Sequence, residues 1–173
     1  MNNRFDKQRE LADELIQIIP LKAEHFESLY QVASDPLIWE QHPNSDRYRR
    51  DVFESFFEGA LASQGAYLIL SKETGEVIGS SRYYDLEEAQ VAIGFTFIGR
   101  AFWGGMYNSA LKKLMITHAF GYLDAVIFHV GSQNLRSQKA VAKLGAKKIA
   151  EQEVSPVKLN YIYQLTKPDW ISR

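Results

Sequence analysis

The chain has 173 residues, of which 46% are hydrophobic and 24% are charged, with a formal net charge of -1 and no cysteine. This length and composition are typical of a soluble globular protein, and we expect residues 1–173 to form a single domain. The charge balance argues against nucleic acid as a partner, and the lack of cysteine excludes disulfides, thiolate metal sites and a cysteine nucleophile. The sequence offers neither a signal peptide nor a membrane span, so we expect a cytoplasmic protein and no membrane partner.

The N-terminal half predicts a strand, two helices and a meander of three strands. Apolar residues recur at helical spacing in both predicted helices, and Asp35-Pro36 ends the first one because the residue before proline avoids the helical region. Short polar links at residues 72–76 and 85–88 join the three strands as antiparallel hairpins. The expected elements are a strand at 15–21, helices at 23–33 and 51–63, and strands at 66–71, 77–84 and 90–98.

The C-terminal half alternates helices and strands. A broad apolar face predicts a helix over 107–120, ended by Gly121 as glycine commonly ends helices. The continuous apolar run 125–130 predicts a strand covered on both faces. A second helix over 134–144, closed by Gly145, and a last strand over 160–165 complete an α/β chain with a mixed, mainly antiparallel sheet.

The segment RAFWGGMYNSALKKLMITHAF, residues 100–120, places Trp103, Gly104, Gly105 and Asn108 at the start of a helix. Helix N-termini carry unpaired N–H groups and a positive dipole, which favour phosphate ligands. The phosphate-loop motif of NTPases is excluded because no Gly-Lys-Ser/Thr follows. The dinucleotide motif is excluded because a strand meander precedes the loop and the glycine spacing is wrong.

A second segment, FHVGSQNLRSQKAVAKLGAKKI at residues 128–149, repeats this pattern. A buried strand ends there, and a polar turn with Asn134, Arg136 and Ser137 opens a lysine-bearing helix. Two neighbouring strands that each end in a polar helix start would form one cleft.

Together, IGFTFIGRAFWGGMYNSALKKLMITHAF and NLRSQKAVAKLGA resemble the acetyl-CoA site of the GNAT superfamily, in the branch related to the ribosomal-protein N-acetyltransferases RimJ and RimL. The similarity covers about residues 15–167. It implies an α/β (α+β) fold in which helices flank a mixed, mainly antiparallel central sheet. It also implies that the strand before the loop contains a bulge that splays it from the next strand, and that the pantetheine arm of acetyl-CoA lies in the gap as a surrogate strand.

The resemblance also implies which residues bind acetyl-CoA. Backbone groups of Phe97 and Ile98 would pair with pantetheine, residues 100–108 would hold the pyrophosphate, and the Asn-x-x-Ser of the second segment would contact the pantetheine arm or the phosphates. The implied binding residues are Phe97, Ile98, Arg100, Trp103, Gly104, Gly105, Met106, Tyr107, Asn108, Asn134 and Ser137.

Two positions depart from the family pattern. The glycines of the family's loop are separated by one residue, whereas Gly104 and Gly105 are adjacent and Met106 takes the place of the second glycine. Ala110 stands where relatives commonly carry Glu. The first departure affects which amides reach the pyrophosphate, and the second removes a polar contact near the helix start.

Acetyl transfer from acetyl-CoA to a primary amine, either a peptide N-terminus or a small amine, is the activity that the resemblance implies. The amine must be neutral, the tetrahedral oxyanion needs a donor such as a strand N–H near Phe97, and the leaving thiolate needs a proton. We expect direct attack in a ternary complex, because the chain has no cysteine and no Ser-His-Asp spacing.

The candidate proton acceptors lie in PLIWEQHPNSDRY, residues 36–48. His42 is the only histidine in a clearly irregular segment, and Glu40 or water are the other options. A solvated loop histidine, or a partner of Asp46, is the alternative interpretation of His42. We interpret His118 as a core histidine and see no surrounding functional groups for His25 or His129.

Other candidates carry less weight. Tyr83, Tyr84, Tyr161 and Tyr163 fall on strands near the expected cleft, where packing is their more common role. No metal is expected, because no two histidines stand at helical ligand spacing with a carboxylate.

Two other functions remain open: a CoA-binding or protein-interaction module without turnover, and a nucleotide-binding oxidoreductase. The sequence also leaves open a homodimer.

Overall fold

The computed structural model describes residues 4–173. Eight strands form one sheet in the order β1-β2-β3-β4-β5-β6-β8-β7. The elements, in chain order, are β1 Leu11–Ala12, β2 Ile16–Pro20, η1 Ala23–His25, α1 Phe26–Ala33, η2 Pro36–Ile38, α2 Arg50–Ser63, β3 Ala66–Ser71, β4 Val77–Tyr84, β5 Gln90–Ile98, η3 Arg100–Phe102, α3 Met106–Phe120, β6 Ala125–Gly131, α4 Leu135–Lys143, β7 Lys147–Ser155, β8 Lys158–Thr166 and α5 Lys167–Ile171. No helix within these described residues is long and apolar enough to cross a membrane.

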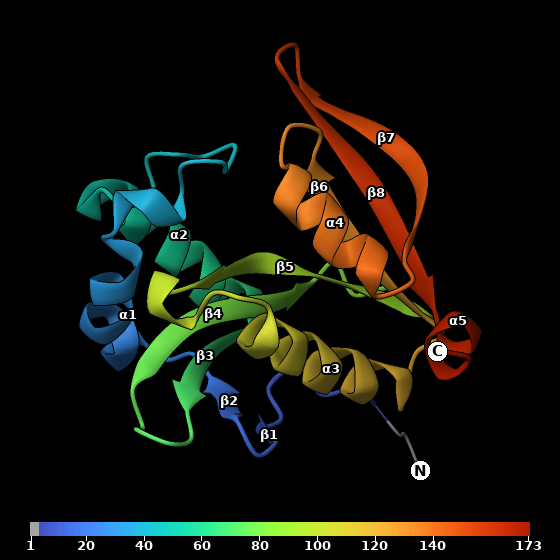
Figure 1. Cartoon of the computed structure of the whole chain (residues 1–173), viewed down its shortest axis with the longest axis horizontal. Coiled ribbons are helices and arrows are strands. Elements are labelled where there is room, and N and C mark those ends of the chain that lie inside the picture. The colour runs from blue at the N-terminus through green and yellow to red at the C-terminus, as the bar shows by residue number, and fades with distance from the viewer. Residues whose placement is uncertain (1–3) are drawn as a thin grey trace.

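The sheet is antiparallel except where β5 and β6 run parallel, joined by the crossover helix α3. Figure 1 shows α1 and α2 beside the β3–β5 meander, and α4 with the β7–β8 hairpin beyond β6. The predicted mixed, mainly antiparallel sheet flanked by helices is therefore confirmed.

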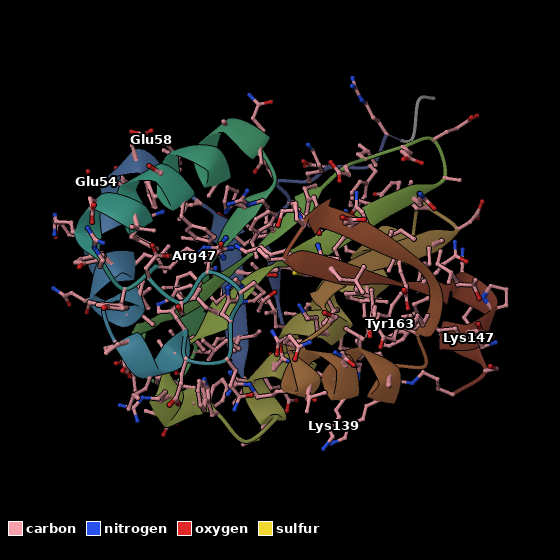
Figure 2. The ribbon with its side chains drawn as sticks, turned by 90° about the horizontal axis from the view of Figure 1, so that it is seen from above. Arg47, Glu54, Glu58, Lys139, Lys147 and Tyr163 are labelled. Atoms are coloured by element: carbon pink, nitrogen blue, oxygen red, sulfur yellow. The ribbon has the colours of Figure 1, made fainter. Side chains whose placement is uncertain are left out.

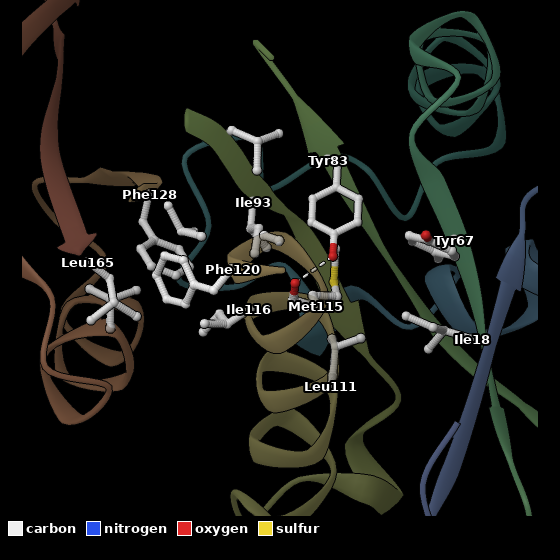
Figure 3. Close-up of a cluster of buried hydrophobic side chains, with 14 of the residues drawn as sticks. Ile18, Tyr67, Tyr83, Ile93, Leu111, Met115, Ile116, Phe120, Phe128 and Leu165 are labelled. Atoms are coloured by element: carbon white, nitrogen blue, oxygen red, sulfur yellow. Dashed lines mark hydrogen bonds between the residues drawn. The ribbon is translucent and has the colours of Figure 1, made fainter. Parts of the chain in front are cut away.

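Each face of the sheet has its own buried cluster. On one face, Leu111 and Met115 of α3 pack on aliphatic and aromatic strand residues, and the Tyr83 hydroxyl donates a 2.6 Å hydrogen bond to the Met115 carbonyl (Figure 3). On the other face, Phe53 and Phe57 of α2 pack with Phe97 of β5. Burial of apolar area on both faces holds β5 between two cores.

Most predicted elements match the structure. The three meander strands have the predicted bounds, and α3 begins one residue earlier than predicted. Gly121 follows the last residue of α3, as predicted, but its φ of -68° is right-handed, so the expected left-handed conformation of a C-terminal glycine is wrong. Gly145 does take a positive φ, of 94°.

The sequence reasoning missed the strands β1 and β7, the helix α5 and the short 3-10 helices η2 and η3. Strand β7 has no buried residue, and its sequence KKIAEQEVS lacks the apolar alternation of a half-buried strand. It lies at the edge of the sheet and pairs only with β8, so backbone hydrogen bonds hold it instead of a buried side-chain face.

Candidate active site

The central feature of the site is a bulge in β5. The pairing of β4 with β5 shifts register between Ser80 and Arg82, which places one extra residue in β5. Phe95 lies in this bulge with a φ of 54°, a left-handed conformation that is rare for a bulky residue. Such bulges bend a strand and redirect its side chains.

Shortly before the bulge, after Ala92, β5 loses its partner on the other side. It pairs with β6 only through Gln90, Val91 and Ala92, whereas β6 continues to Gly131. The sheet therefore splays between β5 and β6. This edge leaves backbone N–H and C=O groups available to an extended ligand, as exposed strand edges do.

Backbone alternation indicates which groups face this splayed edge. Gly99 donates its N–H to the Ile78 carbonyl of β4 at 2.8 Å. Because antiparallel strands alternate their hydrogen-bonding direction, the backbone of Phe97 also points to β4, and those of Thr96 and Ile98 point away from it. The Ile98 carbonyl accepts a 2.8 Å hydrogen bond from Trp103 Nε1.

The loop after β5 presents free backbone at the start of α3. Gly104 and Gly105 have φ angles of 120° and 96°, and a Cβ on either would meet no atom within 4 Å. Gly105 is the residue before α3, and no side chain caps this helix. Positive φ explains the glycines, and the uncapped N–H groups of the helix favour an anion.

The second polar turn lies beside this loop. The guanidinium of Arg136, in the first turn of α4, stacks on the Trp103 ring at 4.2 Å. Asn134 caps α4, accepting the Ser137 N–H at 3.2 Å. The two segments singled out in the sequence thus meet in space, although the α4 start, unlike the α3 start, has its own cap.

The remaining loop residues predicted to bind acetyl-CoA differ from one another in their contacts and exposure. Arg100 pairs with Asp35, and this hydrogen bond holds the pKa of the Asp35 carboxyl below its usual value. Tyr107 packs edge-on against Phe102 at 5.1 Å. Met106 is exposed and Asn108 is partly exposed at the helix start.

His42 lies in the loop between η2 and α2. Its Nδ1 accepts the Asn44 N–H at 3.0 Å, and its Nε2 is 3.4 Å from Arg47 Nη1, so neither neighbour is Asp46. Burial, with the nearby charges of Arg47 and Lys158, lowers the pKa of His42 to about 4. His42 is therefore neutral at pH 7. Glu40 is exposed.

This loop reaches across to the other half of the sheet. Lys158 of β8 donates a 3.1 Å hydrogen bond to Asn44 Oδ1. Pro43 lies so close to Gly131, at the end of β6, that a Cβ there would be 2.9 Å from its ring. The loop thus crosses the open end of the splay.

Tyr84 and His129 form a pair that the sequence analysis missed. The Tyr84 hydroxyl is 2.7 Å from His129 Nδ1. Tyr84 lies over Gly94, where a Cβ would come within 3.1 Å of its ring. The view that nothing surrounds His129 is corrected, because a glycine in β5 lets a β4 tyrosine reach a β6 histidine.

The other two histidines, His118 and His25, make hydrogen bonds to the backbone that hold local structure. His118, predicted as a core histidine, is buried with its Nε2 2.7 Å from the Asp6 carbonyl. His25 Nδ1 accepts the Lys22 N–H at the start of η1. In residues 4–173, no three His, Asp or Glu side chains group as metal ligands would.

Lys112 of α3 is a second residue that the sequence analysis missed. It is 7% exposed, and its Nζ donates a 2.8 Å hydrogen bond to Thr96 Oγ1, which lies 2.8 Å from Ser81 Oγ. Burial lowers the pKa of this amine to about 8. A cationic or neutral amine is thus held directly behind the bulge.

The arrangement of a bulged strand, a splayed parallel neighbour and a glycine loop at a helix start matches a known family. The family model described as "Acetyltransferase (GNAT) domain" matches residues 16–147. The chain belongs to the GNAT family of acetyltransferases. A search of curated protein sequences finds no match to the chain.

Solved structures of GNAT proteins share the fold. A GNAT-family protein from Chromobacterium violaceum is 17% identical with a TM-score of 0.84, covering 98% of this chain and 93% of that one. Mycobacterium smegmatis RimJ in complex with CoA-disulfide is 14% identical with a TM-score of 0.71, covering 93% and 87%. Ribosomal-protein-S5-alanine acetyltransferase from Vibrio fischeri is 14% identical with a TM-score of 0.69, covering 94% and 99%.

Proposed function

We propose that this GNAT protein transfers an acetyl group from acetyl-CoA to a primary amine by direct attack in a ternary complex. The observation that carries the proposal is the unpaired edge of β5, which runs into the open glycine loop and the uncapped start of α3. An extended amide-bearing arm followed by a pyrophosphate fits this sequence of groups.

The residues present fit acetyl-CoA. The edge-facing backbone groups of Thr96 and Ile98 pair with the pantetheine arm, a refinement of the Phe97 and Ile98 assignment from the sequence. The amides that follow Gly104 and Gly105 hold the pyrophosphate. Arg136 lies between Asn134 and Ser137 in the sequence and stacks on Trp103, which brings these two residues within reach of the same ligand.

The reaction moves one proton between the substrates. The amine nitrogen attacks the thioester carbonyl, the C–N bond forms and the C–S bond breaks, and the proton that the amine loses balances the one that the thiolate gains. An edge-facing strand N–H stabilises the oxyanion. We propose His42 as the acceptor of the amine proton, directly or through water, with Glu40 as the alternative on the same loop. The Nδ1 of neutral His42 accepts the Asn44 N–H, so the proton takes the place of this hydrogen bond at Nδ1.

An amine of low pKa suits this weak base. At pH 7 an α-amino group with a pKa of about 7.8 is roughly 14% neutral, whereas a lysine amine with a pKa of about 10.4 is roughly 0.04% neutral. We therefore propose an α-amine or a small amine of similar pKa as the acceptor. The structural likeness to RimJ and to the S5-alanine acetyltransferase supports this choice.

A free-thiol assay tests the proposal. Release of CoA thiol should require both acetyl-CoA and an amine, and mass spectrometry of the amine should show one hydrogen replaced by an acetyl group. CoA, but not ATP or NAD, should raise the melting temperature by binding the native state. Tight CoA binding without thiol release across a broad amine panel would favour a module without turnover.

A further inference from the structure

Two arginines lie together on the face of the sheet that α1 and α2 cover. Arg47 comes from the loop before α2 and Arg82 from β4. Both guanidinium groups lie against the same two rings: Arg47 is 4.6 Å from the Phe56 centroid and 5.9 Å from that of Phe95, and Arg82 is 5.3 Å and 3.9 Å from them. Figure 2 shows Arg47 on the inner side of α2.

Neither arginine has a carboxylate partner in residues 4–173. No ion pair within 4.0 Å joins Arg47 or Arg82 to an acidic group, and Asp46 is exposed. Glu54 and Glu58 of α2 lie on its outer side in Figure 2. Arg82 is 7% exposed, its Nε has no hydrogen-bond partner, and its Nη2 is 3.5 Å from the Phe56 carbonyl.

This arrangement is unfavourable without a ligand. Burial lowers the pKa of both guanidinium groups to about 10. At Arg47 the charge of Arg82 adds to this shift in pKa, and the charge of Asp46 opposes it. Aromatic faces offset part of this cost, since guanidinium groups stack on them. A buried donor such as Arg82 Nε still lacks the acceptor that buried polar groups normally have. An anion would supply that acceptor and neutralise the repulsion.

The pair lies beside the reacting centre. Arg82 is opposite Gly94 in the β4–β5 ladder, and Phe95, whose ring stacks on Arg82, is the bulge residue. Phe95 is 37% exposed and Arg47 is partly exposed, so the pair borders the surface. Lys112 and α3 lie on the opposite face, so the arginines face the side that remains for the acceptor.

We propose that Arg47 and Arg82 bind an anionic group of the acceptor, and that the acceptor is a small amine that carries a carboxylate or phosphate. Guanidinium groups bind both anions through paired N–H donors. The proposal rests on the proposed acetyl transfer. It narrows the acceptor from any low-pKa amine to an anionic one, and disfavours peptide N-termini with neutral first residues.

Matched amines test the acceptor class. We would compare glycine with glycinamide, O-phosphoethanolamine with ethanolamine, and a peptide with a neutral N-terminal residue, each with acetyl-CoA in the free-thiol assay. A nearby anion raises the pKa of an amine, so the rates in each pair are compared per neutral amine. On that basis the anionic member should have a kcat/KM about 10-fold to 100-fold higher, the value of one or two hydrogen bonds to a charged group. The carboxylate and phosphate pairs identify which anion is preferred. Equal rates within both pairs, or preference for the neutral peptide, would overturn the proposal.

Variants test the residues. Arg82→Met and Arg47→Met should each raise KM for the anionic amine about tenfold or more and remove the preference, while the CoA thermal shift stays unchanged. Arg50→Met is the matched control, because Arg50 is exposed and pairs with Glu27 and Glu54. An unchanged preference in both arginine variants would contradict their role.

A binding measurement separates this proposal from the reaction. With saturating CoA present to occupy the proposed pyrophosphate site, and at constant ionic strength, inorganic phosphate should raise the melting temperature of the wild type more than chloride does, and should not do so for Arg82→Met. Arg82→Gln provides a second, polar variant if the methionine variant does not fold. Absence of thiol release with every amine would reject the proposed reaction, whereas absence of a phosphate shift together with equal rates would reject only the anion site.

Discussion

The two faces of the sheet at the β5 bulge are built in different ways. On the α3 face, the candidate donor site is mostly backbone from one continuous segment, the end of β5 through the glycine loop to the start of α3. On the α2 face, side chains from several segments meet: Arg47, Arg82, Phe95, Tyr84 and His129. A site made of backbone amides depends little on side-chain identity and suits one constant ligand, the arm of CoA. A site made of side chains can change its acceptor specificity when those side chains are substituted.

Within residues 4–173, each face buries a cation that forms no ion pair with a carboxylate, but the two cations differ in how well their donors are hydrogen-bonded. Lys112 donates to Thr96, which in turn lies within hydrogen-bond distance of Ser81. Arg82 leaves its Nε without a partner. The buried cation of the α3 face therefore has a hydrogen-bond acceptor within the protein, whereas the buried cation of the α2 face needs a ligand to supply one.

The largest expected effect comes from a substitution that changes the α2 face alone. His42→Ala should lower turnover at pH 7 by roughly 10²–10⁴, the usual range for a general base, and higher pH should partly restore it. Because the pKa of His42 is about 4, the acid side of the wild-type profile should follow the amine and not His42. Glu40→Gln tests the alternative acceptor on the same loop, and should leave turnover unchanged if His42 is the base. Turnover like that of the wild type in His42→Ala would remove His42 from the mechanism.

The next largest effect is expected from substitutions on the α3 face, in the glycine loop. Gly104→Val and Gly105→Val should each weaken CoA binding by about 100-fold, because a branched side chain displaces backbone that donates to the pyrophosphate. Both positions have positive φ, so these variants also lose stability. Gly75→Val is the matched control, since Gly75 has a φ of 73° and open space around it. CoA titrations of all three variants should separate the two effects, and equal CoA affinity in all of them would reject the loop assignment.

The pH dependence of stability tests how fully the α3 face buries the Lys112 amine. Its pKa falls from 10.5 to about 8 on folding, so the unfolded chain holds more protons between these values and stability rises with pH in that window. The free energy of unfolding of the wild type should rise by about 2 kcal/mol from pH 8 to pH 10 relative to Lys112→Met. Lys113→Met, at an exposed neighbour, should follow the wild type. Parallel curves for the wild type and Lys112→Met would show that the amine is not desolvated.

The smallest effect concerns the α4 start. Asn134→Ala should lower stability by about 0.5–2 kcal/mol through loss of the helix cap, and should weaken CoA binding by a larger free energy. Thr166→Ala is the matched control, because Thr166 caps α5 by accepting the Asp169 N–H. Calorimetry of CoA binding and thermal unfolding give the two quantities. Reduced stability with unchanged CoA affinity would limit Asn134 to capping.

The difference between the two faces also explains what the sequence predicted. The meander strands, the α3 start and the α4 start depend on local patterns, and these were found. Only the family resemblance implied the bulge in this strand. Its position had no conformational signal, because a phenylalanine and not a glycine takes the positive φ at residue 95. The Tyr84–His129 pair joins residues 45 positions apart in the sequence, and no spacing rule links them.

Two signals in the sequence could have indicated buried cations. Lys112 falls at helical spacing with the buried Met115 and Ile116, so it interrupts an apolar face. Arg82 stands in a strand whose other residues are apolar, small or aromatic. A charged residue in such a pattern predicts either a buried partner or a functional site.

Amide hydrogen exchange tests the central claim most directly, namely that acetyl-CoA lies along the unpaired edge of β5 and the start of α3. Addition of CoA should slow exchange in the segments 93–98 and 104–108, by at least about tenfold at saturation. Exchange in β7, at the far edge of the sheet, should be unchanged. Protection of other segments with no change at 93–98 and 104–108 would contradict the proposed site.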